Sequence, residues 1–265
     1  MSLLGMTDCL AVRELLEKGE IDLDYLEVHG PFLEDARTVF PVFPMLLHNS
    51  LYHWSLSHPD GLQHMEAGPK TIERLRLARS PWYSLHLGFS CNEVDFSDEA
   101  IQALSPTLPE DTIFDRMSNV LTQLTALLPV PVLIENMDYN PTGAYETVCR
   151  PDFIRRILEH TNTFFLLDLA HARVTASANG IPVEEYLAQL PLEKVRQIHL
   201  NRPGWQELRL VDAHLALEEE DYALFESVFE RTHPWAVTLE YNRDKNRIAG
   251  QVQQLRQIMG KALGE

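Results

Sequence analysis

Residues 164–171 read FFLLDLAH, and this stretch decides the fold prediction. The apolar run from Phe164 to Leu167 predicts a short buried strand, and Asp168 and His171 follow at the point where that strand would end. The same arrangement, an apolar run that closes on a histidine or a carboxylate, recurs along the chain. In a closed barrel of parallel strands the C-terminal strand ends lie around one ring, so polar residues there point into a shared space. The stretch therefore predicts one barrel strand with candidate functional residues, Asp168 and His171, at its C-terminal end.

Around this stretch, short β-prone runs alternate with longer amphipathic segments. We predict strands at residues 3–6, 25–28, 45–48, 82–86, 132–135, 164–168, 197–199 and 236–240. We predict helices at residues 8–18, 69–78, 97–103, 112–127, 151–160, 182–189, 219–231 and 246–262, the first with Thr7 as its N-cap and Gly19 as its stop. This order predicts an α/β fold, a single (β/α)8 TIM barrel. An open doubly wound sheet is the alternative, although the sequence has no glycine-rich first βα turn to support one.

Length and charge narrow the class of protein. The chain has 265 residues, which is typical of one such barrel, so we expect a single domain over residues 1–265. Its 39 acidic and 22 basic residues give a net charge of −17, which disfavours tight binding to nucleic acid unless the fold gathers a local basic patch. No apolar run reaches the roughly 18 residues that a membrane span needs. Residues 1–10 do not have the pattern of a secretory signal, so we expect a cytoplasmic protein. Cys9, Cys91 and Cys149 are too scattered to predict a disulfide framework or a cysteine metal site.

Nine histidine and acidic residues end or follow the predicted strands. They are His48, His86, Glu135, Asp168 and His199 at the ends of five consecutive strands, His171 three residues after Asp168, Asp212 and His214 in the next loop, and Glu240 at the end of the last strand. Four carboxylates alone in one ring would repel one another, and cations between them and the five histidines would remove that conflict. Imidazole and carboxylate ligands together suit iron, zinc or manganese, and the absence of cysteine among these nine residues argues against metals that select thiolates. Each residue alone is commonly structural, but five consecutive strand ends of this kind predict a metal centre.

Other residues near the strand ends are weaker candidates. His29 ends the second predicted strand beside Glu27, and we expect it to face the substrate, to support a metal ligand or to be structural. The aromatic residues Tyr52, Trp54, Trp205 and Tyr241 are candidates either for lining a pocket at the mouth or for covering the core. The remaining histidines, which are His53, His58, His64, His160 and His233, are interpreted as surface or loop residues.

The order of the nine residues resembles the ligand set of the xylose-isomerase-like barrels that hold three metals, a set shared by the zinc-dependent AP endonucleases of the endonuclease IV type. The spacings Asp168-x-x-His171 and Asp212-x-His214 are specific in combination. A closer resemblance is to the DUF692 family, now called multinuclear non-heme iron-dependent oxidases. The segments that carry it are LEVH at 26–29, Leu47-His48 followed by WSLS at 54–57, LHLGFS at 85–90, IEN at 134–136, LLD at 166–168, IHL at 198–200 and DAH at 212–214.

This resemblance implies a centre of two to three divalent metal ions, with iron first and zinc or manganese as alternatives. One ion would be held by His48, His86 and Glu135, a second by Glu135, Asp168, His199 and Glu240, and a third by His171, Asp212 and His214. The resemblance further implies that a cysteine thiolate of a ribosomally made peptide binds iron, that a neighbouring iron activates dioxygen, and that a partner protein presents the peptide. The chain departs from many members in Asn201-Arg202-Pro203 where they have a second histidine, in His171 where they have asparagine, and in Tyr241-Asn242 where they have Trp-Asp. None of these changes removes a metal ligand.

Four functions are compatible with the sequence. The first is an iron-dependent oxidase acting on a peptide or a small thiol. The second is a sugar isomerase or epimerase with one divalent metal on Glu135, Asp168, His199 and Glu240, in which Glu135 and Glu240 move a proton on opposite faces of the substrate. The third is a zinc-dependent phosphodiesterase for damaged DNA, which the charge of −17 disfavours. The fourth is a metal-binding scaffold without activity. We rank the oxidase first, because an isomerase has no use for the other five ligands, and we take Glu135, Glu240 and His29 as the candidate catalytic residues.

Overall fold

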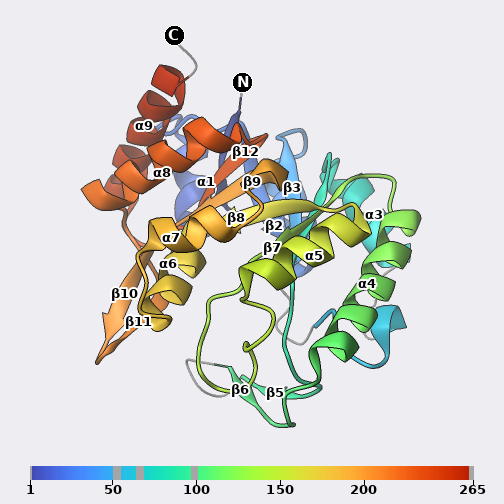
Figure 1. The fold of residues 1–265 in the computed structure, drawn as a ribbon. Helices are drawn as coiled ribbons and strands as arrows, with labels where there is room; N and C mark the ends of the chain where they lie inside the picture. The colour runs from blue at the N-terminus through green and yellow to red at the C-terminus, as the bar shows by residue number, and fades with distance from the viewer. Residues whose placement is uncertain (1, 50–54, 64–68, 97–100, 263–265) are drawn as a thin grey trace.

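The computed structural model describes residues 2–49, 55–63, 69–96 and 101–262. Within them, eight parallel strands close into a barrel in the order β1-β12-β9-β8-β7-β4-β3-β2, so barrel strands that follow one another in the chain lie side by side (Figure 1). They are β1 (Leu3–Thr7), β2 (Tyr25–His29), β3 (Met45–Asn49), β4 (Tyr83–His86), β7 (Val132–Glu135), β8 (Phe164–Asp168), β9 (Val195–Leu200) and β12 (Ala236–Leu239). The closed parallel barrel confirms the (β/α)8 prediction, and the open doubly wound sheet is wrong.

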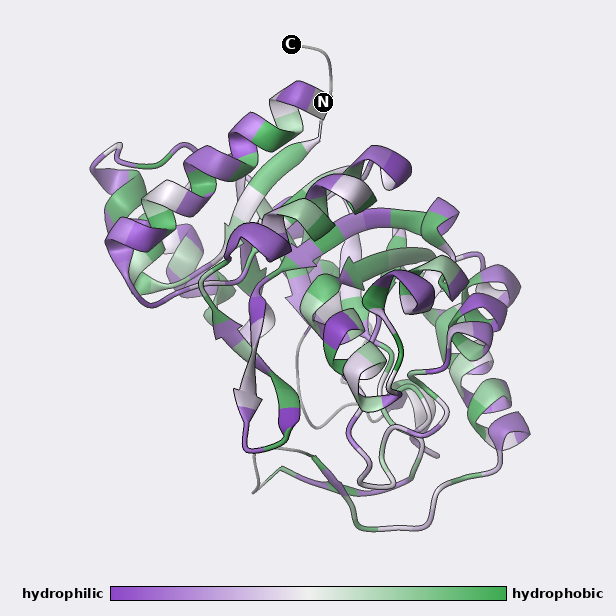
Figure 2. Ribbon diagram, turned by 60° about the vertical axis from the view of Figure 1, so that its left-hand side comes forward, coloured by the Kyte–Doolittle hydropathy of each residue, from purple (hydrophilic) through white to green (hydrophobic). Residues whose placement is uncertain are grey.

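Helices lie around the outside of this barrel (Figure 1). In the described part of the chain they are α1 (Leu10–Glu17), α2 (Leu33–Val39), α3 (Pro69–Ala78), α4 (Glu110–Leu127), α5 (Pro151–Thr161), α6 (Leu169–Ala178), α7 (Val183–Gln189), α8 (Glu219–Thr232) and α9 (Lys245–Ala262). The helix α5 buries Phe153, Ile154, Ile157 and Leu158, a spacing that places them along one stripe of the helix. Figure 2 shows the resulting mixture of hydrophobic and hydrophilic residues along the helices.

The side chains inside the barrel change from apolar to polar along its axis. One buried apolar cluster consists of Tyr25, Leu46, Trp82, Leu133, Leu166 and Ala236. Successive side chains of a strand point to opposite faces, so the residue two positions later faces inward again. Those residues are Glu27, His48, Ser84, Glu135, Asp168 and Thr238. The barrel is therefore closed by apolar side chains towards its N-terminal end and lined by polar side chains towards its C-terminal mouth.

Two antiparallel strand pairs project at the C-terminal mouth. The strands β10 (Arg202–Gln206) and β11 (Arg209–Leu215) form a hairpin between β9 and α8, and both pack against α6. The strands β5 (Val94–Asp95) and β6 (Gln102–Ala103) form a smaller pair. In Figure 1 both pairs lie below the barrel, at the end opposite the chain termini. Asp212 and His214 therefore lie on a strand rather than in the loop predicted for them.

The helix predicted at residues 97–103 is wrong where it can be compared. Residues 97–100 lie outside the described part of the chain, and Gln102 and Ala103 form β6. The backbone N–H of Ala103 donates to the carbonyl of Thr142 at 3.2 Å, and the Thr142 hydroxyl donates to the carbonyl of Ile101 at 2.6 Å. Hydrogen bonds to residues about forty positions away hold this segment, so its local helical pattern does not decide its structure.

Several element ends also differ from the prediction. Thr7 is the last residue of β1, and the N-cap of α1 is Cys9. Gly19 follows α1 with a φ of +67°, the left-handed conformation in which glycine ends a helix, so this stop is confirmed. The sequence analysis does not predict α2 or α6, and α6 starts directly after the last residue of β8. None of the helices in the described ranges is long and apolar enough to cross a membrane.

Candidate metal centre

The nine predicted ligands lie at the C-terminal mouth of the barrel. His86, Glu135 and Asp168 are the last residues of β4, β7 and β8, and His48 and His199 are the next-to-last residues of β3 and β9. The helix α6 supplies His171, β11 supplies Asp212 and His214, and Glu240 follows β12. The strand register pairs His86 with Glu135 and Asp168 with His199, so these residues are neighbours across the sheet. Asp212 and His214 are two residues apart on β11, where the pairing with β10 is irregular, and their side chains are in contact.

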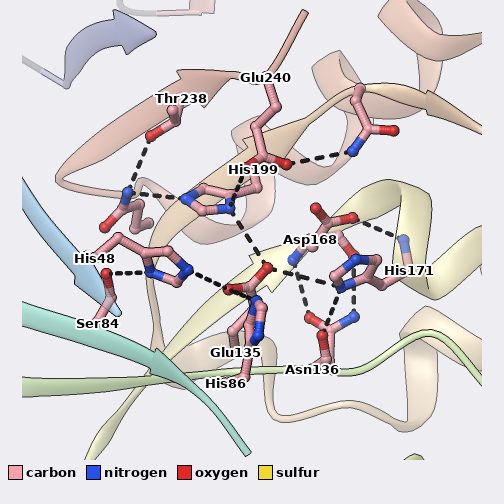
Figure 3. A network of polar contacts seen from close by, with 12 residues as sticks. His48, Ser84, His86, Glu135, Asn136, Asp168, His171, His199, Thr238 and Glu240 are labelled. Atoms are coloured by element: carbon pink, nitrogen blue, oxygen red, sulfur yellow. Dashed lines mark hydrogen bonds and ion pairs between the residues drawn. The ribbon is translucent and has the colours of Figure 1, made fainter. Parts of the chain in front are cut away.

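Three of these side chains form a first compact group. His48 Nε2 lies 3.3 Å and His86 Nε2 lies 3.1 Å from Glu135 Oε2 (Figure 3). His48 is 2% exposed and Glu135 is 1% exposed. One ligand atom from each residue lies within 4.8 Å of the others, as the ligands of a single ion do. The structure thus brings the first predicted ligand set together.

The other oxygen of Glu135 reaches a second group. Glu135 Oε1 lies 3.4 Å from His199 Nδ1, and Glu240 Oε1 lies 3.3 Å from the same nitrogen. Asp168 joins Glu135 and His199 in a group whose ligand atoms all lie within 4.8 Å, whereas Glu240 forms such a group with His199 and Glu27. Glu135 is therefore placed between two groups, with one carboxylate oxygen facing each.

The third predicted set is connected through one carboxylate. Asp212 Oδ2 lies 2.8 Å from His214 Nε2 and 3.6 Å from His171 Nε2. Among the described residues, this set is not one whose ligand atoms all lie within 4.8 Å of one another, so it is more open than the first two groups. His214 has a φ of 46°, a left-handed conformation that costs a non-glycine residue energy and is found preferentially at functional sites.

The second ring nitrogen of several of these histidines is held by a neighbouring group. His48 Nδ1 lies 2.9 Å from Ser84 Oγ, His171 Nδ1 lies 2.7 Å from the carbonyl of Asn136, His199 Nε2 lies 3.0 Å from Glu27 Oε2, and His214 Nδ1 lies 3.1 Å from the carbonyl of Glu240. Such partners fix the orientation and tautomer of a metal-binding histidine. The sequence analysis missed Ser84, Asn136 and Glu27 in this role. The two-residue strand repeat could have found Ser84, which lies two positions before His86.

Burial and charge shift the pKa values of the central groups in opposite directions. Burial lowers the pKa of His48 to about 3, so its ring is neutral, the form that binds metals. Burial raises the pKa of Asp168 to about 8. Burial also works to raise the pKa of Glu135, but the positive charges of His86 and His199 hold it well below its usual range. Adjacent acids and histidines therefore have sharply different proton affinities, as is common at functional sites.

Several buried polar atoms of the centre have no hydrogen-bond partner, and they indicate which kind of ligand these residues can hold. Glu135 Oε2, Asp168 Oδ2, His199 Nδ1 and Asp212 Oδ1 are buried and have no hydrogen-bond partner. Buried polar atoms are nearly always hydrogen-bonded, so four such atoms in one cluster need an explanation. Cations between them would accept their lone pairs and offset the repulsion of the carboxylates. The nitrogen and oxygen donors therefore fit divalent metal ions.

A cavity of about 1550 Å³ opens above the centre. Its described lining includes His29, His86 and Glu135, and residues 206–209 of the β10–β11 hairpin. The ring of His29 lies 5.5 Å from that of His48, so the structure brings this residue to the site. Pockets for small molecules usually have volumes of about 300 to 1,000 Å³, so this cavity has room for a larger ligand.

The structure tests some of the predictions for the four aromatic residues and for the histidines that were interpreted as surface or loop residues. Trp205 is 67% exposed, Tyr241 is 5% exposed, and neither is among the described residues that line the cavity. Tyr52 and Trp54 lie outside the described residues, as do His53 and His64. His160 and His233 are exposed and His58 is partly exposed, which agrees with their interpretation as surface or loop residues.

Solved structures of low sequence identity share the fold. A D-tagatose 3-epimerase-like protein has a TM-score of 0.69 at 13% identity, over 99% of this chain and 98% of that protein. A xylose isomerase-like TIM-barrel protein from Mycobacterium smegmatis in complex with magnesium has a TM-score of 0.67 at 13% identity, over 99% and 97% of the two chains. A protein from Thermus thermophilus, from a crystal soaked with ZnCl2, has a TM-score of 0.61 at 17% identity, over 97% and 98%. These likenesses show the xylose-isomerase-like barrel fold and no more.

Curated relatives with clearer sequence similarity are UPF0276 proteins. One from Paraburkholderia phytofirmans is 29% identical over 227 residues, which are 83% of this chain and 71% of the relative. One from Caulobacter vibrioides (strain NA1000) is 31% identical over 119 residues, or 44% of this chain and 42% of the relative. One from Bordetella pertussis is 27% identical over 190 residues, or 69% and 64%. The matched part is thus less than two thirds of the length of the last two relatives.

A family model covers nearly all of the chain. Residues 20–261 match the model described as RiPP precursor modification enzyme MbnB/TglH/ChrH, where RiPP denotes a ribosomally made and post-translationally modified peptide. The match includes all nine predicted ligands, and it confirms the resemblance to the DUF692-type family. The chain therefore belongs to the MbnB/TglH/ChrH family of RiPP precursor modification enzymes.

Proposed function

We propose that this protein is a multinuclear non-heme iron oxidase that modifies a cysteine-containing peptide at the mouth of its barrel. The observation that carries the proposal is the position of Glu135, which lies between two groups of buried histidines and acids. A carboxylate in this position can hold two cations near one substrate, as two-metal enzymes require. Membership of a family of peptide-modifying enzymes supports the choice of a peptide substrate.

In this proposal the nine predicted ligands divide into three sets. His48, His86 and Glu135 would hold one ion, Glu135, Asp168, His199 and Glu240 a second, and His171, Asp212 and His214 a third. Two histidines and one carboxylate form the ligand type that non-heme iron oxygenases use, with positions left for substrate. When bound, iron would supply the one-electron and dioxygen chemistry that carboxylates and imidazoles alone do not provide.

The chain itself would bind and orient the substrate. A cavity of about 1550 Å³ suits a peptide segment better than a monosaccharide. His29 lines this cavity beside His48 and is placed to take the proton that a cysteine thiol releases when it ionises. Glu240 Oε2 accepts a hydrogen bond of 3.3 Å from Asn201 Nδ2, which orients the carboxylate at the edge of the centre. The proposal includes a partner protein that presents the peptide, and a cytoplasmic location in which thiols stay reduced.

A sugar isomerase or epimerase is the closest competitor, because the solved barrels with this fold include epimerase-like proteins. Such an enzyme would use one divalent ion on Glu135, Asp168, His199 and Glu240. The other five predicted ligands, which are His48, His86, His171, Asp212 and His214, all line the same cavity. An isomerase has no use for them, so their presence favours the multinuclear oxidase.

Anaerobic loading of the full chain with ferrous iron tests the proposal. We expect elemental analysis to find two to three iron ions per chain. We expect a cysteine-containing peptide to change the visible absorption of the loaded protein and to consume oxygen, whereas the same peptide with serine in place of cysteine should do neither. The variant His86→Ala should lose at least one ion and most of the oxygen consumption. His160→Ala, which removes an exposed histidine of α5, is the matched control and should retain both. A single bound ion together with epimerisation of a ketose would instead establish the isomerase.

A further inference from the structure

A buried carboxylate lies beneath the metal centre and contacts one of its histidines. Glu27 and His199 are both 0% exposed, and His199 Nε2 lies 3.0 Å from Glu27 Oε2. A carboxylate without a proton only accepts hydrogen bonds, so this contact requires the hydrogen of His199 to be on Nε2. The sequence analysis named Glu27 only as the neighbour of His29 and gave it no role.

The orientation of Glu27 is held by two other donors. Gln197 Nε2 lies 2.5 Å from Glu27 Oε2, and Thr238 Oγ1 lies 3.2 Å from the same oxygen. The amide of Gln197 is itself oriented, because the indole N–H of Trp82 donates to Gln197 Oε1 at 2.8 Å. An indole N–H can only donate, so the Gln197 oxygen must face Trp82 and its NH2 group must face Glu27. Glu27 Oε2 therefore accepts from Gln197 and Thr238 as well as from His199, whereas Glu27 Oε1 has no hydrogen-bond partner; Gln197 Nε2 also lies 3.3 Å from His199 Nε2.

The position of Glu27 decides which nitrogen of His199 faces the centre. With Nε2 facing Glu27, the opposite nitrogen, Nδ1, lies 3.4 Å from Glu135 Oε1 and 3.3 Å from Glu240 Oε1. Nδ1 is also one of the buried atoms that lack a hydrogen-bond partner. His48 and His86 differ, because each directs Nε2 towards Glu135. His199 thus has the opposite ring orientation, and Glu27 is the group that accounts for it.

We propose that Glu27 is a positioning residue for the metal centre, because it holds the hydrogen of His199 on Nε2 and directs the lone pair of Nδ1 at the ion shared with Glu135. This inference rests on the proposed function, in that the centre must bind metal. A carboxylate behind a metal-binding histidine fixes the ring and strengthens it as a ligand, and its loss typically weakens metal binding by about 10- to 100-fold. Glu27 Oε1 is buried without a hydrogen-bond partner, and the ligand atoms of Glu27, His199 and Glu240 lie within 4.8 Å of one another, so direct binding of an ion by Glu27 is the alternative that the test must exclude.

Nitrogen-15 NMR of the full chain loaded with Zn²⁺, a diamagnetic probe, tests the inference without any activity measurement. In the wild-type protein we expect His199 to show a metal-bound Nδ1 and a protonated Nε2. The variant Glu27→Gln keeps an acceptor but loses the charge, and Glu27→Leu loses both. We expect both to keep the number of zinc ions, to shift the His199 signals, and to bind zinc about 10- to 100-fold more weakly in competition with a chelator, with the larger effect in Glu27→Leu. Tyr25→Phe is the matched control, since it removes a hydroxyl that lies 2.8 Å from Thr238 Oγ1 and leaves the Glu27–His199 contact in place. It should change zinc affinity less than about twofold.

The outcomes separate this inference from the proposed function. Zinc bound through His199 Nε2, or an unchanged zinc affinity in Glu27→Leu, would overturn the role of Glu27 and leave the metal centre standing. Loss of one complete ion in Glu27→Gln would also overturn it, because Glu27 would then be a ligand. A wild-type chain that binds no metal would overturn both. The wild-type spectrum by itself tests the ring orientation, so the inference stays testable if a variant does not fold.

Discussion

Replacing Glu135 with glutamine tests whether one carboxylate holds two metal ions. Glu135→Gln keeps the size of the side chain, which is 1% exposed, and removes its charge. Glu135 Oε2 contacts His48 and His86, and Glu135 Oε1 contacts His199. One substitution therefore takes an anionic ligand from both groups, and we expect the variant to lose two ions rather than one.

The size of the effect follows from the linkage between binding and folding. One ion at a free concentration of 100 times its dissociation constant stabilises the folded state by about 2.7 kcal/mol, so two such ions contribute about 5 kcal/mol. The chain has 265 residues. With an unfolding entropy of about 2.1 cal/mol/K per residue, 1 kcal/mol corresponds to roughly 2 °C in Tm. We expect metal to raise the Tm of Glu135→Gln by about 10 °C less than it raises that of the wild type, because an ion that does not contact Glu135 contributes equally to both proteins.

Scanning calorimetry with and without Zn²⁺ measures these shifts, and elemental analysis counts the ions. The control His160→Ala changes an exposed histidine whose ring packs against Phe114, so it should keep the full metal-dependent shift. An unchanged metal-dependent shift in Glu135→Gln would refute the shared role of Glu135. A metal-dependent shift that is only about 5 °C smaller than that of the wild type, with one ion lost, would show that Glu135 serves only one of the two groups.

Three further predictions concern residues around the centre. The Asp168 carboxylate accepts a hydrogen bond in the first turn of α6, and asparagine can replace it in that role. Asp168→Asn should therefore change the free energy of unfolding of the metal-free protein by less than about 1 kcal/mol, yet lose at least one ion by elemental analysis. Retention of every ion would contradict the role of Asp168 as a ligand. Gly88 has a φ of +98°, and a Cβ there would lie 2.8 Å from a backbone nitrogen. Gly88→Ala should therefore lower the free energy of unfolding, measured in urea, by more than about 1 kcal/mol. An unchanged unfolding midpoint would argue against this backbone conformation. Burial raises the pKa of Cys91 to about 11 and that of Cys149 well above its usual value. A thiol reagent at about pH 8 should therefore label Cys9 alone in the folded protein and all three cysteines after unfolding. Fast labelling of a second thiol in the folded protein would contradict this prediction.

The strand ends could be predicted because the information about them is local. Side chains two positions apart share a face of a strand, so Leu166 and Asp168 both point into the barrel. Sequential strands of a (β/α)8 barrel are also neighbours in space, and the observed strand order follows the chain. A local repeat and a simple topology together place around one mouth the six predicted ligands at barrel strand ends, which are His48, His86, Glu135, Asp168, His199 and Glu240.

Contacts between distant segments lie beyond the sequence pattern. Glu27 and His199 are 172 positions apart, and nothing in the residues around Glu27 indicates that the two meet. The helix predicted at residues 97–103 is wrong for a related reason, since its described end pairs with β5 and with Thr142. The hairpin that holds Asp212 and His214 is predicted as a loop, although their spacing of two residues is that of a strand face.

By itself the sequence determined the barrel, the order of its strands and the polar character of its mouth, because hydrophobic periodicity and chain order specify these features locally. The tertiary structure alone decided that His199 presents Nδ1 where His48 and His86 present Nε2, and that Glu27 supports it. These properties depend on distances of about 3 to 4 Å between side chains from strands that are far apart in the chain. Only closure of the barrel sets such distances.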